Sequence, residues 1–180
     1  MEEKIVYFEQ AGAENTATVL RLVKERAAAR GIKKMVLAST RGDTARQALE
    51  AFATTSIKMV VIPHQFGFGE RQRFPPELVT ALEANGHRVH FSTMLFHTDD
   101  FYRVRTPTAM ANLLRIFCQG IKVCVEIILM AADGGHLEQG EPVIAVSGTA
   151  RGADTAVVAR AATSTRLTEL RIQEIICKPL

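Results

Sequence analysis

Short runs of apolar residues alternate along this chain with longer segments in which apolar positions recur every three or four residues. A short apolar run bounded by turn-forming residues is typical of a β-strand, whereas the longer period indicates a helix with one buried face. The predicted strands are residues 5–8, 35–38, 58–62, 88–91, 142–146 and 172–177. The predicted helices are residues 16–30, 44–53, 76–85, 108–117 and 121–132. The alternation predicts an α/β fold, in which helices cover both faces of a sheet.

Glycine and proline mark several element boundaries. Gly31 and Gly86 each follow a predicted helix, where a left-handed cap residue is expected, and Pro75 and Pro76 open another helix. No low-complexity linker interrupts the pattern. Residues 1–180 are therefore predicted to form one domain.

Composition and charge exclude several classes of protein and partner. The 180 residues are 47% hydrophobic and 23% charged, which is ordinary for a globular protein. The first residues lack a signal-peptide pattern, and the longest apolar run, residues 123–132, is too short to cross a bilayer. We therefore expect a soluble cytoplasmic protein without a membrane partner. The net charge of +3 comes from scattered Lys and Arg residues, so nucleic acid is not an expected partner.

The three cysteines form no Cys-x-x-Cys pair, and each lies among apolar residues. This pattern is typical of buried thiols in a reducing compartment, so no metal site is expected. The sequence also lacks the common hydrolase, metalloprotease, Walker and dinucleotide-binding signatures.

Two segments nearly repeat each other: residues 41–45 (Arg-Gly-Asp-Thr-Ala) and residues 151–156 (Arg-Gly-Ala-Asp-Thr-Ala). Each follows a predicted strand and leads into a segment of helix-forming composition, residues 45–52 and 156–162. A turn between a strand and a helix presents free N–H groups and the positive end of the helix dipole to a phosphate or carboxylate. Both turns would lie at carboxyl ends of strands, where α/β sheets bind ligands, so we expect them to bind one ligand together.

The first turn has two interpretations. Thr44 and Gln47 fit a capping box, and Asp43 is a good N-cap that also repels an anion. Capping does not require the hydroxyls and the guanidinium that precede it, and these groups suit phosphate oxygens. The candidate ligand-binding residues are Ser39, Thr40, Arg41, Gly42 and Thr44.

The second turn contains two glycines on either side of an arginine. Glycine allows a positive φ and a close approach of the backbone to a ligand, although a flexible surface turn has the same composition. The candidate residues are Gly148, Thr149, Arg151, Gly152 and Thr155.

The segment 119–133 is apolar on nearly all sides, which predicts a buried helix. Its internal charges, Lys122 and Glu126, are four residues apart. Buried charges are costly unless paired, so the two side chains form either a structural ion pair or a ligand contact in which Glu126 positions Lys122.

Two further stretches are predicted to be surface loops near a site, residues 65–74 and 93–107, because they mix aromatic, charged and turn-forming residues. His64 stands at the end of a predicted strand, which is a common place for an active-site residue. It could equally bind a backbone carbonyl in a loop. The other four histidines show no metal-ligand spacing.

Taken together, these segments resemble free-standing proteins similar to the C-terminal domain of pyruvate kinase, over almost the whole chain. The matching segments are residues 7–9, 15–16, 38–45, 64–67, 114–126, 148–156 and 174–179. The resemblance implies a three-layer α/β/α sandwich with a mostly parallel five-stranded sheet and an added strand. It also implies that Gly67 and Gln119, with His64, belong to the site. Where relatives tend to carry a Thr-His pair and a Ser-Gly turn, this chain has Thr-Met-Leu-Phe-His at residues 93–97.

The same resemblance implies a function. In full-length pyruvate kinases the segment equivalent to residues 39–44 binds a phosphate of a sugar-bisphosphate activator, and the free-standing proteins are associated with flavin mononucleotide (FMN). The barrel that transfers phosphoryl groups has no counterpart here, so kinase activity is not expected. We expect FMN binding, with the phosphate at one of the two turns and Lys122 near the flavin ring, and redox chemistry on a small molecule if the protein is an enzyme.

Two alternatives remain open: a non-catalytic regulatory module that binds a phosphorylated metabolite, and a purely structural assembly domain. Self-association is also expected, because the terminal strands 5–8 and 172–177 could leave an unpaired sheet edge, with Ile175 and Ile176 available for burial. We expect a dimer or larger closed homo-oligomer.

Overall fold

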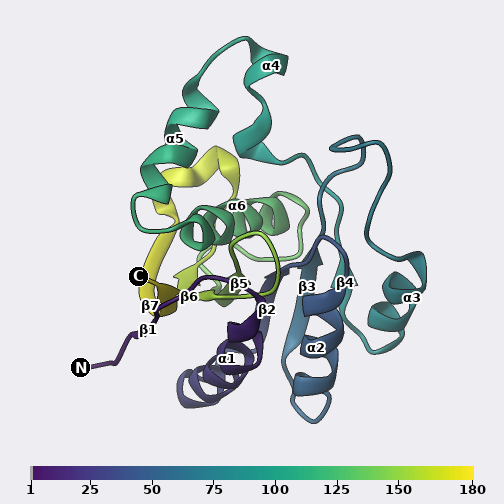
Figure 1. Cartoon of the computed structure of the whole chain (residues 1–180), viewed down its shortest axis with the longest axis vertical. Coiled ribbons are helices and arrows are strands. Elements are labelled where there is room, and N and C mark those ends of the chain that lie inside the picture. The colour runs from purple at the N-terminus through teal and green to yellow at the C-terminus, as the bar shows by residue number, and fades with distance from the viewer. Residues whose placement is uncertain (1) are drawn as a thin grey trace.

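A seven-stranded sheet forms the middle layer of the protein in this computed structural model, which describes residues 2–180 (Figure 1). The strands are β1 (Val6–Phe8), β2 (Lys34–Ala38), β3 (Lys58–Ile62), β4 (Arg88–Val89), β5 (Pro142–Ser147), β6 (Thr155–Arg160) and β7 (Arg171–Pro179). Their order is β1-β7-β6-β5-β2-β3-β4, and β6 alone runs against its neighbours. The predicted α/β class and mostly parallel sheet are confirmed. The sheet has seven strands, whereas five strands and one added strand were expected.

Helices cover both faces of the sheet. The helices are α1 (Thr16–Arg30), α2 (Asp43–Phe52), α3 (Pro76–Ala84), α4 (Asp99–Tyr102), α5 (Thr106–Arg115) and α6 (Gln119–Asp133), with 3₁₀ turns η1 (Ala13–Asn15), η2 (Leu95–His97) and η3 (Ser164–Glu169). Residues of α1, α2 and α3 pack on one face of the sheet, and α6 packs on the other. This arrangement is the expected three-layer sandwich.

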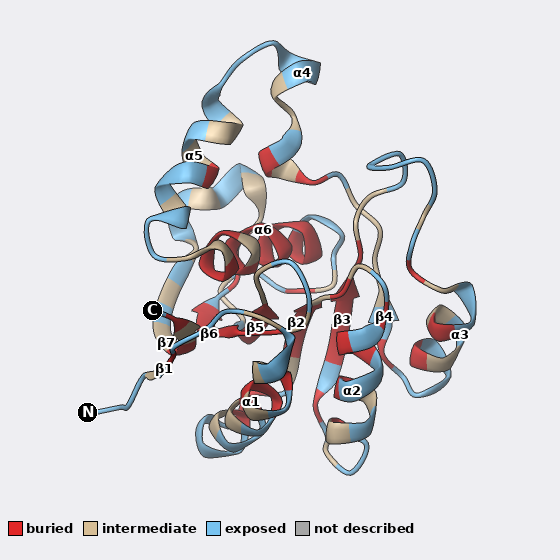
Figure 2. Cartoon of the chain, viewed as in Figure 1, coloured by how far each residue is buried: buried red, intermediate tan, exposed pale blue. Residues whose placement is uncertain are grey.

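Helix α6 is buried along nearly its whole length, as Figure 2 shows. The sheet covers one side of it, and residues of η2 and α5 pack on another side. The prediction of a buried helix is therefore confirmed. Lys122 and Glu126 have exposed fractions of 1% and 2%, so both charges are inside the protein.

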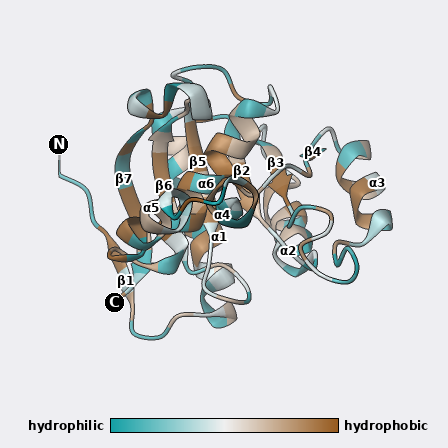
Figure 3. Cartoon of the chain, turned by 90° about the horizontal axis from the view of Figure 1, so that it is seen from above, coloured by the Kyte–Doolittle hydropathy of each residue, from teal (hydrophilic) through white to brown (hydrophobic). Residues whose placement is uncertain are grey.

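The segment 156–162, expected to be helical, contains most of strand β6 instead. Strand β6 pairs in antiparallel fashion with both β5 and β7, and all of its residues except Arg160 are buried. The β-branched residues Thr155, Val157 and Val158 suit such a strand, because their branched side chains pack well on a pleated surface. Its neighbour β5 is mostly brown, the colour of apolar residues, in Figure 3. The second turn is consequently a hairpin loop between β5 and β6, without a helix dipole.

The sheet edges also differ from the prediction. Strand β7 lies inside the sheet between β1 and β6, so the edges are β1 and β4. Ile175 and Ile176 therefore do not lie on an open edge. The two predicted glycine caps do adopt left-handed conformations, with φ of 64° at Gly31 and 75° at Gly86.

Only one of the two stretches predicted to be loops is a loop in the structure. Residues 65–74 contain no helix or strand, as expected. Residues 93–107 instead contain η2, α4 and the start of α5. Within residues 2–180, no helix is long and apolar enough to span a bilayer.

Candidate functional site

A cavity of about 360 Å³ opens at the carboxyl ends of β2, β3 and β5. This is the usual place for a ligand in an α/β sheet, and the volume is in the range of small-molecule sites. Both glycine-containing turns and helix α6 contribute to its wall. The predicted residues that line it are Ser39, Thr40, Arg41, Thr44, His64, Gln119, Lys122, Glu126, Gly148, Arg151 and Gly152.

The first turn leads into α2, but it does not form the predicted capping box. Gly42 is the N-cap, with φ of 89° and no side-chain cap bond. Instead, the Ser39 hydroxyl accepts a hydrogen bond from the Ala45 amide at 3.3 Å. A Cβ atom at position 42 would lie 2.6 Å from the Leu78 side chain, so glycine is required there. Gly42 shapes the turn and does not line the cavity.

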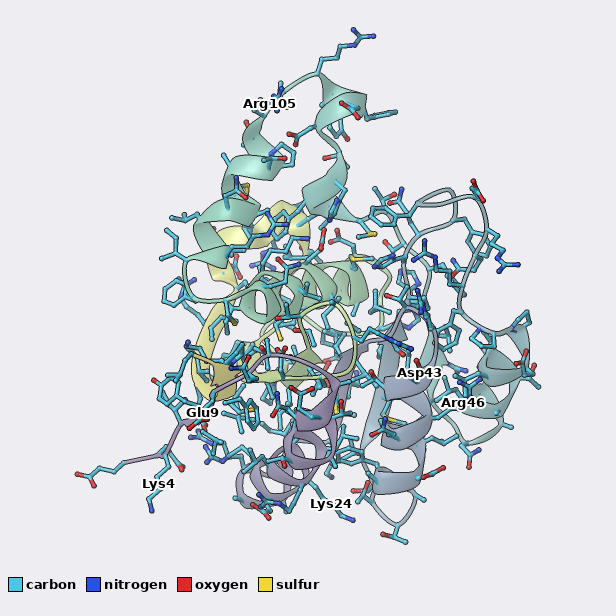
Figure 4. The ribbon with its side chains drawn as sticks, in the orientation of Figure 1. Lys4, Glu9, Lys24, Asp43, Arg46 and Arg105 are labelled. Atoms are coloured by element: carbon cyan, nitrogen blue, oxygen red, sulfur yellow. The ribbon has the colours of Figure 1, made fainter. Side chains whose placement is uncertain are left out.

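Three arginines line the exposed side of the cavity: Arg41, Arg73 and Arg151. Within residues 2–180, the side chains of Arg41 and Arg73 make no hydrogen bond or ion pair. The Arg151 guanidinium lies 3.8 Å from the Asp43 carboxylate. The same carboxylate lies 3.6 Å from Arg46, and Asp43 and Arg46 are both labelled in Figure 4. The charged residues that line this side of the cavity are thus three arginines and one carboxylate, and this excess of positive charge favours an anionic ligand.

The second turn is organised by a fully buried residue, Asp154, which was not among the predicted site residues. Its carboxylate accepts hydrogen bonds from the Thr149 amide at 2.9 Å, the Gly12 amide at 3.2 Å and the Thr155 hydroxyl at 2.7 Å. Thr149 and Thr155 therefore bind Asp154, and neither lines the cavity.

Gly152 has φ of 72°, and an added Cβ would lie 2.4 Å from the Cα of Ala13. The backbone of Gly152 thus makes the predicted close approach, and the segment it approaches is η1 and the start of α1. Gly152 also borders the cavity.

The buried side of the cavity contains a Lys122–Glu126–His97 cluster. Lys122 Nζ lies 2.5 Å from Glu126 Oε2 and 3.1 Å from His97 Nε2. The Phe96 amide donates to the other carboxylate oxygen, Glu126 Oε1, at 2.8 Å. Burial lowers the pKa of Lys122, and the nearby Glu126 carboxylate opposes this shift. Burial and the Lys122 charge lower the pKa of His97, which favours a neutral imidazole.

His64 lines the cavity beside this cluster. Its ring packs edge-on against Phe68, with ring centres 4.6 Å apart, and Phe68 packs in turn against His97 at 5.4 Å. Burial and Arg73 lower the pKa of His64. Within residues 2–180 its ring nitrogens make no hydrogen bond, so the alternative that the ring binds a backbone carbonyl is not observed. Its own carbonyl accepts from Gln72 Nε2 at 2.9 Å, which fixes the loop containing Arg73.

The structure therefore brings most of the predicted residues together, but Gly42, Gly67, Thr149 and Thr155 do not line the cavity. It adds residues that the sequence analysis did not select: Asp43, Phe68, Arg73, Met94, His97 and Ala150. Several of these come from the two stretches predicted to be loops near a site. Their composition indicated the region but not which side chains would meet Lys122.

Comparison with protein-family models finds no match for this chain. Among solved structures, pyruvate kinases from Cryptosporidium parvum align with 81% of the chain. One such structure has a TM-score of 0.45 and 16% identity, as does the same organism's enzyme in complex with ADP, and another has 0.43 and 15%. The chain spans only 22% or 23% of the length of these enzymes.

Proposed function

We propose that the cavity binds a phosphorylated small molecule, and that FMN is this ligand. The observation that carries the proposal is the set of three arginines, Arg41, Arg73 and Arg151, which line the exposed side of the cavity with only one carboxylate, that of Asp43, among them. The start of α2 and the hydroxyls of residues 39–44 adjoin these arginines. Guanidinium groups, hydroxyls and a helix N-terminus are the usual partners of a phosphate group.

The rest of the cavity suits the ring system of FMN. Its wall includes the apolar side chains of Phe68, Met94, Ile127 and Met130, and a planar ring can pack against them. Lys122 lies on the buried side, where we place the flavin ring. Bound FMN would supply two-electron chemistry, while the residues of the chain bind and orient it. The proposed membership of the family similar to the pyruvate kinase C-terminal domain points to the same ligand.

A regulatory module that binds a phosphorylated metabolite is the second candidate. It is favoured by the Lys122–Glu126 pair, because the two buried charges balance each other and need no charged ligand. Turnover in a screen of electron donors with FMN-loaded protein would favour the oxidoreductase. Metabolite binding without turnover would favour the module.

The experiment that tests FMN binding compares FMN with riboflavin. Ligand-free protein is titrated with each compound, after an absorbance spectrum of the freshly purified protein has been recorded. FMN is expected to bind more tightly, because only FMN carries the phosphate that the arginines attract. Equal affinities would contradict a phosphate site at the arginines.

We also propose that the protein is cytoplasmic and self-associates. Its three cysteines are free, and two of them, Cys124 and Cys177, are buried. Burial raises the pKa of Cys177 to about 12, which keeps the thiol protonated and unreactive. Free, buried thiols are typical of a reducing compartment.

A further inference from the structure

The two sides of the cavity differ in net charge. On the exposed side, three guanidinium groups and one carboxylate, that of Asp43, line the cavity, and Arg151 lies 3.8 Å from this carboxylate. On the buried side, the ammonium of Lys122 is balanced by the carboxylate of Glu126, with side chains only 2% and 3% exposed. The histidines beside this pair add no charge in their neutral forms, which burial favours. The cavity is therefore strongly positive at one end and neutral at the other.

Lys122 nevertheless retains hydrogen-bonding capacity. A lysine ammonium has three N–H donors, and within residues 2–180 two acceptors engage it, Glu126 Oε2 and His97 Nε2. The ring of Phe96 lies 5.3 Å from Nζ and accepts no conventional hydrogen bond. One donor thus remains on a buried group that lines the cavity. A buried donor is stabilised when it meets an acceptor.

The position of Lys122 is fixed by its neighbours. The Phe96 amide holds Glu126 Oε1, so the carboxylate is tied to η2 as well as to α6. Because the ammonium can only donate, Nε2 of His97 must be the acceptor, and the proton of the neutral ring is on Nδ1. Lys122 is therefore oriented before a ligand binds.

We propose that the buried end of the cavity selects an uncharged hydrogen-bond acceptor, such as a carbonyl oxygen, and that Glu126 determines this specificity by neutralising Lys122. The ligand class is then a molecule with a phosphate at one end and a neutral, carbonyl-like group at the other. A molecule with an anion at both ends is disfavoured, because its second charge would be desolvated beside a neutral pair that includes a carboxylate. This inference rests on the proposed function only for the phosphate at the arginines.

The test uses two probes that differ by one phosphate, fructose 6-phosphate and fructose 1,6-bisphosphate, beside FMN. Each is titrated into the full chain by calorimetry. The wild-type protein is expected to bind the bisphosphate no more tightly than the monophosphate. Glu126→Gln leaves Lys122 uncompensated, so the ratio of affinities should move at least about tenfold toward the bisphosphate.

Two further variants control for folding and for charge. Lys122→Gln combined with Glu126→Gln removes both charges and keeps the buried end neutral, so the wild-type ratio should return. Lys122→Met leaves the Glu126 carboxylate without its cation, so the ratio of affinities should move toward the monophosphate. Circular dichroism checks whether each variant folds, and Lys122→Met, for which a shifted ratio is also expected, provides the test if Glu126→Gln does not fold.

The outcomes separate this inference from the proposed function. If FMN fails to bind but the sugar phosphates follow the expected ratios, the FMN proposal is wrong and the inference stands. If FMN binds and Glu126→Gln leaves the ratio unchanged, the inference is wrong. A wild-type preference of tenfold or more for the bisphosphate, or a double variant that departs from the wild-type ratio, would also overturn it. If no phosphorylated probe binds, both fail.

Discussion

At the scale of single residues, Arg41 has a side chain that no structural role explains. It lines the cavity and, within residues 2–180, its guanidinium has no hydrogen-bond or ion-pair partner. Arg41→Ala should therefore weaken FMN binding by about 1.5–3 kcal/mol, the value of a charge-assisted hydrogen bond, and hardly change stability. Fluorescence titration and a thermal melt measure the two effects.

Arg46→Ala is the matched control for this prediction. Arg46 lies in the first turn of α2, close to Arg41 in sequence, and pairs with Asp43, but it does not line the cavity. FMN affinity should stay close to that of the wild type. Arg73→Ala and Arg151→Ala, measured in the same way, identify which turn or loop holds the phosphate. If none of the three cavity arginines affects binding, the turns are structural.

The Lys122–Glu126 pair leads to the second prediction. Lys122→Met leaves a buried carboxylate uncompensated and should lower the free energy of unfolding by roughly 3–5 kcal/mol. Adding Glu126→Leu should recover much of this loss, although the Phe96 amide then lacks its acceptor, at a cost of about 1–3 kcal/mol. Urea unfolding measures both. A double variant with normal stability and unchanged FMN affinity and reduction potential would exclude a ligand role for Lys122.

At the scale of elements, the turn between β5 and β6 depends on Gly152. Its φ of 72° and its 2.4 Å approach to Ala13 mean that Gly152→Ala meets both backbone strain and a steric clash. Gly140→Ala is the matched control, because Gly140 has φ of 76° and nothing within 4 Å of an added Cβ. The control should cost about 1 kcal/mol, and Gly152→Ala clearly more. Equal losses in chemical denaturation would contradict the packing role of Gly152.

The elements also show how far sequence patterns predict this fold. Helix α1 and strand β3 have the predicted bounds, because a clear apolar period ends at Gly31 in one case and a continuous apolar run defines the other. Strand β6 was mistaken for a helix, since its alanines favour helices in isolation and only pairing with β5 and β7 decides otherwise.

The candidate site, like the fold, was predictable from the sequence only in part. The turns at the carboxyl ends of β2 and β5 follow from strand order, but the meeting of Lys122 with His97 depends on how η2 packs on α6. No spacing in the sequence encodes that contact. The role of Ser39 as the acceptor for the Ala45 amide was missed for a related reason, because the left-handed Gly42 displaces the capping interaction from its usual positions.

At the scale of the whole molecule, the histidines make stability depend on pH. Burial lowers the pKa of all five, and His87 also accepts a hydrogen bond from the Met59 amide through Nδ1. Below about pH 6.5 the unfolded chain therefore binds more protons than the folded protein. The free energy of unfolding should therefore fall as the pH decreases through this value. Urea unfolding midpoints at pH 7.5 and pH 5.5 measure this fall.

His87→Gln serves as the control, because it removes one of these titrating groups. It should reduce the difference between the two urea midpoints, whatever it does to their absolute values. An equal or higher midpoint at pH 5.5 for the wild-type protein would show that the histidines do not dominate its pH dependence.

Exposed apolar surface, and not an open sheet edge, is the feature of this structure that favours self-association. The sheet edges are β1 and β4, which pair through only three and two residues, so neither offers a long edge to a second copy. Helices α4 and α5 project beyond α6 in Figure 1, and these helices and the residues next to them expose large apolar side chains. These are Phe101, Tyr102, Val104, Leu113, Ile116 and Phe117. Large exposed apolar surface is unusual on a monomer, and the same surface on two copies can meet across a two-fold axis.

We therefore expect a dimer or larger closed oligomer at micromolar concentration, in which α4 and α5 of one copy pack against those of another. Light scattering should give a multiple of the 19.8 kDa chain mass. Phe101→Ser combined with Ile116→Ser should return the mass to that of one chain, because these side chains are 81% and 76% exposed and contribute most by burial. Phe66→Ser, at a site 67% exposed but outside this projection, should leave the mass unchanged. A wild-type mass of one chain would refute self-association, and an oligomer that survives the double substitution would place its interface elsewhere.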